Sequence, residues 1–152
     1  AGAGMSLAVS GDLVYAARSA KFTMAYTAAG LSPDGSSTYF MPRLIGLRRT
    51  QELMLTNRVL SAEEALDWGL LNAVYDDDAV IYEAQKVAEL LATGATKSYG
   101  NVKKLLNDSF TNTLETQMEL EARGIAAAAQ TRDGAAGIEA FVNKKKADFT
   151  GE

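Results

Sequence analysis

The spacing of apolar residues predicts that the first part of the chain mixes strands with helices. Short apolar runs predict extended segments at residues 13–17, 21–24 and 70–75. Apolar stretches and helical spacing predict helices near residues 5–9, 38–44 and 48–56. Pro42 is expected to kink or end the helix that contains it. Ser61 and Glu64 match a capping box, which predicts a further helix that ends near Gly69. These elements indicate an α/β arrangement with few, short strands.

From residue 76 onward the pattern is helical almost throughout. Apolar residues recur at helical spacing in four groups: Val80, Ala84, Val87 and Leu91; Val102, Leu105 and Leu106; Leu114, Met118, Ala122, Ile125 and Ala129; and Ile138, Phe141 and Val142. Gly94 is expected to end the first of these helices. Asn112 with Glu115 is expected to start the third, and Asp133 the fourth. No repeat or linker interrupts the sequence, so we predict one domain over residues 1–152.

Composition limits the chemistry that this chain can carry out. It contains no histidine and no cysteine, which excludes Ser-His triads, cysteine nucleophiles, thiolate zinc sites and disulfide scaffolds. Any acid–base step must therefore use Asp, Glu, Lys or Tyr. Fifteen basic and nineteen acidic residues give a net charge of −4, which argues against nucleic-acid and anionic-membrane partners. No apolar run approaches the ~18 residues of a membrane span, and no basic segment precedes an apolar core, so we expect a soluble, cytoplasmic protein.

Two short segments could carry chemistry. Gly2-Ala3-Gly4 precedes an apolar helix and could bind an anion or oxyanion through free amides, or could be a flexible terminus. Asp34 lies in a turn-rich loop over residues 30–37, between apolar segments. Burial of its surroundings would suit this carboxylate to proton transfer or nucleophilic attack, whereas a simple Pro-Asp-Gly turn would give it a structural role only.

Other polar clusters favour structural roles. Three aspartates at 76–78 are expected to cap a helix, because no second ligand cluster accompanies them, and we expect no metal site. The basic runs at 48–49 and 144–146 are typical of solvated helix faces, with phosphate contact as the alternative. The larger aromatic residues are expected in the core rather than stacked on a ligand; they are Tyr26, Tyr39, Phe40 and Trp68.

The order of several motifs along the chain is more specific than any single one. The motifs lie at residues 2–13, 17–22, 30–37 (Gly-Leu-Ser-Pro-Asp-Gly-Ser-Ser), 41–46, 52–56, 60–65, 69–72 and 137–144. In this order and spacing they resemble the crotonase (enoyl-CoA hydratase/isomerase) superfamily over essentially the whole chain. The resemblance implies the C-terminal part of a crotonase-like (ClpP/crotonase) spiral fold, an α/β fold with few short strands at the start and mostly α-helix afterwards. Residues 1–75 would form the end of the core spiral and residues 76–152 a helical assembly region, without the family's N-terminal half.

The resemblance also assigns roles to single residues. The family's Gly-rich turn supplies a backbone amide to the thioester oxyanion, and Ala3 holds that position with Gly4 beside it. Hydratases carry two catalytic glutamates at positions that are Ser6 and Tyr26 here, so water addition by such a pair is not expected. Asp34 stands where isomerases of ring-derived acyl-CoAs have their catalytic aspartate and chlorobenzoyl-CoA dehalogenases their nucleophile. Gly4 and Tyr26 are expected to line the substrate site.

The function implied first is that of an acyl-CoA double-bond isomerase, with Asp34 as base or nucleophile and an enolate held at Ala3. Dehalogenase-like hydrolysis is one alternative, and a non-catalytic module that binds CoA esters or only assembles is another. Coenzyme A enters as the substrate thioester, so no separate cofactor is expected. In the family the terminal helix reaches the nucleotide end of CoA through an aromatic residue and a lysine, which Phe141 and Lys144 match. The final helices of family members pack subunits into trimers that often pair into hexamers, and we expect such a homotrimer or hexamer here.

Overall fold

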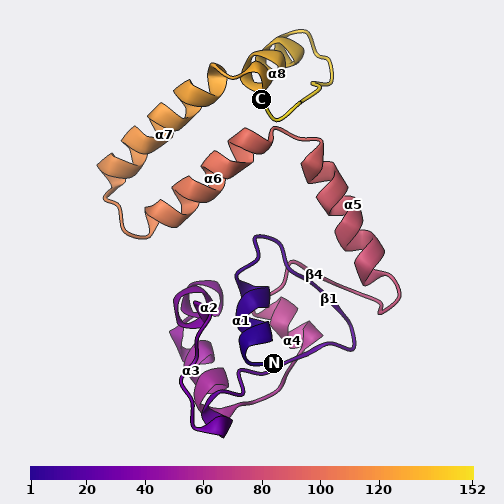
Figure 1. Ribbon diagram of the computed structural model, residues 1–152, viewed down its shortest axis with the longest axis vertical. Helices are drawn as coiled ribbons and strands as arrows, with labels where there is room; N and C mark the ends of the chain where they lie inside the picture. The colour runs from indigo at the N-terminus through magenta and orange to yellow at the C-terminus, as the bar shows by residue number, and fades with distance from the viewer. The chain divides into compact units, whose positions relative to one another are not determined.

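The computed structural model describes all residues, Ala1–Glu152, as two compact units, Ala1–Ala84 and Gln85–Glu152 (Figure 1). The boundary lies inside helix α5 (Val80–Ala92), a few residues after the predicted change of pattern at residue 76. Each unit is therefore described by itself. The roles predicted for the two parts, a core spiral and an assembly region, stay predictions.

The first unit combines short helices with two small sheets. Its elements are α1 (Ala3–Val9), β1 (Tyr15–Ala17), β2 (Lys21–Phe22), the 3₁₀ helix η1 (Thr27–Ala29), α2 (Ser37–Ile45), α3 (Leu47–Thr56), β3 (Leu60–Ser61), α4 (Ala62–Asp67) and β4 (Ala73–Tyr75). Strands β1 and β4 pair in parallel, with Tyr15 opposite Ala73, and β2 pairs with β3 antiparallel, with Lys21 opposite Ser61. Each of the three predicted extended segments contains an observed strand, which confirms these predictions.

The hydrophobic core lies within the first unit, where α1 packs on α2 and α2 on α3. It is rich in methionine: Met5, Met24, Met41 and Met54 are all buried, around the fully buried Leu53. Methionine suits a core built from many short elements, because its flexible unbranched side chain fills irregular gaps. The core therefore fixes α1 against the segments that follow it.

A local signal sets the start of one helix in this unit, whereas another does not end its helix. The capping box of α4 is confirmed: the Ser61 hydroxyl accepts from the Glu64 amide at 3.2 Å, and the Glu64 carboxylate accepts from the Ser61 amide at 3.2 Å. Of the two effects expected of Pro42, a kink or an end, the end does not occur, since α2 continues past it to Ile45. Met41 and Ile45 are both buried on either side of Pro42. Their burial offsets the one backbone hydrogen bond that proline removes.

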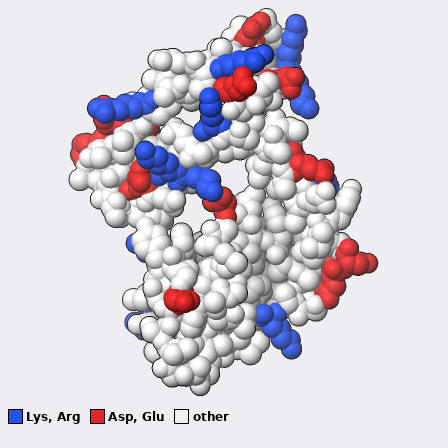
Figure 2. Space-filling view, in the orientation of Figure 1, with Lys and Arg blue, Asp and Glu red and all other residues white.

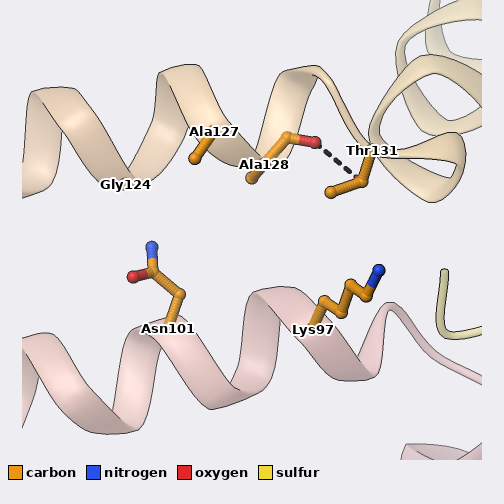
Figure 3. A pocket seen from close by; sticks show the side chains of 6 residues that line it. All are labelled: Lys97, Asn101, Gly124, Ala127, Ala128 and Thr131. Atoms are coloured by element: carbon orange, nitrogen blue, oxygen red, sulfur yellow. Dashed lines mark hydrogen bonds between the residues drawn. The ribbon is translucent and has the colours of Figure 1, made fainter.

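The second unit is helical, with the later part of α5 followed by α6 (Thr96–Ser109), α7 (Leu114–Ala129) and α8 (Arg132–Val142). Helices α6 and α7 run side by side in opposite directions (Figure 1). Gly124 and Ala128 of α7 face Lys97 and Asn101 of α6 across a shallow hollow of about 180 Å³ (Figure 3). A Cβ on Gly124 would lie only 2.5 Å from Asn101 Nδ2, so glycine allows this close approach.

Threonines, rather than the predicted residues, cap the last two helices. The Thr113 hydroxyl accepts from the Thr116 amide at the start of α7, and Thr131 caps α8. Asn112 and Asp133 were expected there, and both predictions are wrong. Thr113 and Thr131 are the caps because each has an extended backbone conformation just before its helix. From there the threonine hydroxyl reaches the backbone amide three residues later.

Asp133 instead anchors the C-terminal segment to α8. Its carboxylate is 3% exposed and accepts from the Thr150 amide at 2.8 Å and the Gly151 amide at 2.9 Å. The hydrogen bond from the Thr150 amide, supported by that from Gly151, lowers the pKa of Asp133. The charged form is therefore favoured in the folded state.

The apolar faces of α6 and α7 in the second unit are exposed. Within α7, Leu114, Met118 and Ile125 are 70%, 58% and 72% exposed. In α6, Val102 and Leu106 are also exposed, and only Leu105 of that group is partly buried. The predicted helices are confirmed, and their apolar faces are not covered within the chain. Two or three helices alone cannot enclose an apolar stripe on every member.

The surface gives two further observations. In Figure 2, Lys and Arg side chains lie among Asp and Glu side chains on the face in view, and they form no broad basic area there. None of the helices combines the length and the apolar character that crossing a bilayer requires.

Candidate active site

The first turn of α1 presents a backbone amide at the surface of the first unit. Gly2 has φ +51°, a conformation that favours glycine, and its amide donates to the Thr23 carbonyl at 2.9 Å. The amide of Gly4 donates to the Ala1 carbonyl at 3.1 Å, whereas the exposed Ala3 amide donates no hydrogen bond within the chain. Amides of a first helical turn have no partner inside the helix and are available to an anionic oxygen. The geometry thus leaves Ala3 as a free donor.

The loop that carries Asp34 packs against this same helix. Gly35 has φ +60°, and a Cβ built on it would lie 2.9 Å from the Cβ of Ser6. The Asp34 carbonyl accepts from the Ser37 hydroxyl at 2.9 Å, which ties the loop to the start of α2. Ser6 follows Ala3 by three residues, about 4.5 Å along the helix axis and on the same face. The loop therefore holds Asp34 close to the first turn of α1.

Tyr26 links Asp34 to Ser6. The Tyr26 hydroxyl donates to Asp34 Oδ1 at 2.6 Å and lies 3.0 Å from Ser6 Oγ. Ser6 is completely buried, Tyr26 is half-buried, and Asp34 is exposed. Three residues from α1, the start of η1 and the loop before α2 thus form one hydrogen-bonded chain.

The predicted site residues fall into two groups. Ala3, Gly4, Tyr26 and Asp34 all lie in the first unit. Phe141 lies in the last turn of α8 in the second unit, where it is 85% exposed, and Lys144 follows α8 as an exposed residue with φ +53°.

The structure adds to what was expected of three of these residues. Asp34 is exposed in this chain, together with its neighbours Gly35 and Ser36, so the expected burial of its surroundings is not observed. Tyr26 packs against the core, as expected, and its hydroxyl in addition donates a hydrogen bond to Asp34. Ser6 was not singled out as a site residue. The signal that could have found it is its spacing, one helical turn after Ala3 on the same face.

The aspartates at 76–78 and the nearby basic residues form structural contacts. Asp76 accepts from Arg18 at 3.1 Å, and Asp77 accepts from the Ser19 amide at 3.0 Å, instead of capping a helix as expected. Hydrogen bonds from Ser19 lower the pKa of Asp77, and the Asp76 carboxylate, followed by Glu63, raises the pKa of Arg18. These pairs fasten the turn between β1 and β2 to the residues before α5.

A second charged cluster surrounds Trp68. Arg58 pairs with Glu52 at 2.8 Å and with Glu64 at 3.0 Å, and these carboxylates, Glu52 first, raise the pKa of Arg58. The guanidinium groups of Arg58 and Arg49 lie 5.1 Å and 4.7 Å from the centre of the Trp68 ring. Arg49, from one of the predicted basic runs, is therefore engaged in a cation–π contact.

The whole chain is similar to a family of known proteins. Residues 1–152 match the family described as enoyl-CoA hydratase/isomerase. The 1,2-epoxyphenylacetyl-CoA isomerase of Escherichia coli (strain K12) is 43% identical over 152 residues, which cover 100% of this chain and 58% of that protein. The 4-chlorobenzoyl coenzyme A dehalogenase-1 of Arthrobacter sp is 36% identical over 126 residues, covering 83% of this chain and 45% of that protein.

A solved structure shares the fold over nearly the whole chain. The enoyl-CoA hydratase/isomerase of Cupriavidus metallidurans CH34 superposes with a TM-score of 0.90 at 39% identity, and the match covers 99% of this chain and 57% of that one. The chain thus spans less than two thirds of the length of these relatives. Its short strands and long helices form part of a crotonase fold, and the chain belongs to the enoyl-CoA hydratase/isomerase family.

Proposed function

We propose that the protein containing this chain is an acyl-CoA isomerase, in which Asp34 moves a proton between two carbons of the acyl group and the Ala3 amide holds the enolate oxygen. The observation that carries the proposal is the placement of Asp34 by Gly35 and Tyr26, beside the helix whose first turn leaves the Ala3 amide free. A base and an oxyanion donor on one side of the same helix are the two groups that enolate chemistry needs. The relative that is 43% identical is also named an isomerase.

The proposed reaction balances without another reactant. The Asp34 carboxylate takes a proton from a carbon of the acyl group, and the anion that this leaves is conjugated with the thioester carbonyl. The C–H electrons move into the carbonyl, and the negative oxygen accepts a hydrogen bond from Ala3. The protonated Asp34 then returns the proton to another carbon of the same conjugated system, which moves the double bond and restores the carboxylate. The thioester is the substrate, and the proposal requires no cofactor or metal.

Hydroxyls at two positions argue against water addition. Ser6 and Tyr26 occupy the positions where the resemblance places the two hydratase glutamates, and they bond to each other and to Asp34. Neither can act as the general base that activates water in a paired-carboxylate mechanism. A single carboxylate that gives back the proton it takes is sufficient for isomerisation.

The test uses the protein expressed from its complete reading frame. Enoyl-CoA substrates incubated in D₂O should take up deuterium as the double bond moves, which mass spectrometry of the product measures. Asp34→Asn should lower turnover about 10²–10⁴-fold, as expected for a lost acid–base group. Asp67→Asn, a change of an exposed carboxylate on α4, is the matched control and should leave turnover unchanged. Undiminished turnover of Asp34→Asn would refute the role proposed for this residue.

Dehalogenase-like hydrolysis is the second candidate, and one observation favours it. Asp34 is exposed and its Oδ2 has no hydrogen-bond partner within the chain, so this oxygen is free to act as a nucleophile. Attack on an aryl carbon would form an ester and release halide, and water would then hydrolyse the ester. A single turnover in H₂¹⁸O-labelled water would then leave ¹⁸O in the carboxyl group of Asp34, whereas isomerisation would leave none. Binding of CoA esters without either reaction would instead indicate a non-catalytic module.

We further propose that the second unit serves CoA binding and assembly in the cytoplasm. Phe141 and Lys144 are exposed, as contacts to the nucleotide end of CoA require. The uncovered apolar faces of α6 and α7 support association into a homotrimer or hexamer, because monomers rarely expose large apolar patches. Light scattering at micromolar concentration tests this, and a well-folded monomer would contradict it.

A further inference from the structure

The hydrogen-bonded chain from Ser6 to Asp34 has a defined direction. An ionised carboxylate can only accept hydrogen bonds, so the Tyr26 hydroxyl must give its one hydrogen to Asp34 Oδ1. The phenol oxygen is then an acceptor, and the Ser6 hydroxyl at 3.0 Å is the donor that faces it. The other acceptor within reach of Ser6, the Gly2 carbonyl, lies at 3.4 Å, which is long for an O–H donor.

The two oxygens of Asp34 are therefore unequal. Oδ1 accepts a short, charge-assisted bond from Tyr26, whereas Oδ2 has no partner within the chain. We propose that Tyr26 is a positioning residue, which holds Oδ1 and leaves Oδ2 as the oxygen that takes the substrate proton and returns it. We propose also that Ser6 acts through Tyr26, by fixing the orientation of the phenol. This inference rests on the isomerase function proposed above.

The backbone around Tyr26 supports a positioning role. Ala25 has φ +52°, in the left-handed region that residues with a Cβ seldom adopt, and the Tyr26 amide donates to the Met24 carbonyl at 2.6 Å across this turn. The Tyr26 carbonyl then accepts from the amides of Ala29 and Leu31, both at 3.0 Å. A strained residue persists only where its surroundings determine it, and such residues gather at functional sites. Here the backbone hydrogen bonds of Tyr26 hold the start of η1, from which the phenol extends to Asp34.

The burial of Ser6 supports its part in the chain. Ser6 is completely buried on α1, between the helix and the Gly35 backbone. Alanine would fill the same space without burying a hydroxyl, which costs free energy unless it is hydrogen-bonded. The phenol of Tyr26 is the partner that satisfies it at ordinary distance.

The experiment measures kcat and KM in the protein expressed from its complete reading frame, for Tyr26→Phe, Ser6→Ala and the double variant. Tyr26→Phe should lower kcat about 10–100-fold, the range for losing a hydrogen bond to a charged group, with KM within about two-fold. Ser6→Ala should lower kcat several-fold. The double variant should be no slower than Tyr26→Phe alone, because Ser6 has no route to Asp34 once the phenol is gone.

Tyr15→Phe, which removes a tyrosine hydroxyl on β1, is the matched control and should keep wild-type kinetics. Multiplied effects in the double variant would overturn the role of Ser6. Raised KM with unchanged kcat in Tyr26→Phe would overturn the positioning role and make Tyr26 a substrate-binding residue. Asp34→Asn distinguishes a failure of this inference from a failure of the proposed function. If it is inactive while Tyr26→Phe keeps its kcat, this inference alone is wrong, and if it stays active, the proposed function is wrong. Ser6→Ala, a change that leaves the backbone intact, tests the chain even if Tyr26→Phe folds poorly.

Discussion

Replacement of Gly35 by alanine is the most direct test of how the Asp34 loop is held. Gly35 has φ +60°, and an added Cβ would lie 2.9 Å from the Cβ of Ser6. The left-handed conformation alone costs about 1–2 kcal/mol for a residue with a side chain. Carbon atoms pack best at about 3.5–4.0 Å, so the approach to Ser6 adds an overpacking cost of about 1–3 kcal/mol. The total loss of stability is expected to be about 2–5 kcal/mol.

Gly30→Ala separates the two contributions. Gly30 has φ +71° and no heavy atom within 4 Å of a Cβ built on it, so alanine there causes conformational strain without a clash. Both substitutions restrict the unfolded chain equally, so this effect cancels in the comparison. Urea unfolding of the two variants measures the difference. Gly35→Ala should have the lower midpoint, by about 0.5–1.5 M if both variants have a slope of about 2 kcal/mol/M.

The same pair of variants links stability to the site. Gly35→Ala should also reduce turnover, because the loop must move away from Ser6 and takes Asp34 with it, whereas Gly30→Ala should not. Removing the Ser6 Cβ in a Ser6→Gly/Gly35→Ala double variant should cost less stability than the sum of the two single changes. Equal midpoints for Gly35→Ala and Gly30→Ala would refute the close approach of the loop to α1.

Three further predictions concern the second unit. Because the Thr150 amide lowers the pKa of Asp133 below its unfolded value, this carboxylate stabilises the fold above about pH 4 and loses that effect as pH falls through the lowered pKa. The protection factor of the Thr150 amide against hydrogen exchange, which corrects for the intrinsic effect of pH, should fall over that range, and in Asp133→Asn it should be low throughout. Gly100→Ala should raise the thermal midpoint, because its Cβ would meet no other atom and alanine favours a helix over glycine by about 0.5–1 kcal/mol. Gly134→Ala should lower the midpoint, because its Cβ would clash with the backbone of α7. Calorimetry compares the two variants. Lys144→Ala should weaken binding of a CoA ester more than of its 3′-dephospho analogue in calorimetric titrations, and equal loss for both would exclude a contact to that phosphate.

The sequence by itself determined those features that depend on neighbouring residues. The capping box at Ser61 and Glu64 and the helical spacing after residue 76 are local, so they could be predicted and are present in the structure. The places of Asp34 and Ala3 in the order of motifs were enough to identify them as candidate site residues. Which of two neighbouring residues caps a helix is harder to predict. Asn112 and Thr113 both have a side-chain oxygen that could accept from the first amides of α7, and only the backbone conformation decides between them.

Only the tertiary structure decided what lies beside each element. The chain Ser6–Tyr26–Asp34 joins three segments that the sequence separates by up to 28 positions, and no local pattern specifies that a serine on one helix meets a phenol from another turn. Periodicity likewise predicted the apolar face of α7 at Ile125, but a stripe at helical spacing is the same whether its cover comes from the same chain or from elsewhere. Burial and hydrogen-bond partners depend on the packing of distant segments, and for that reason they were settled by the fold and not by the local sequence.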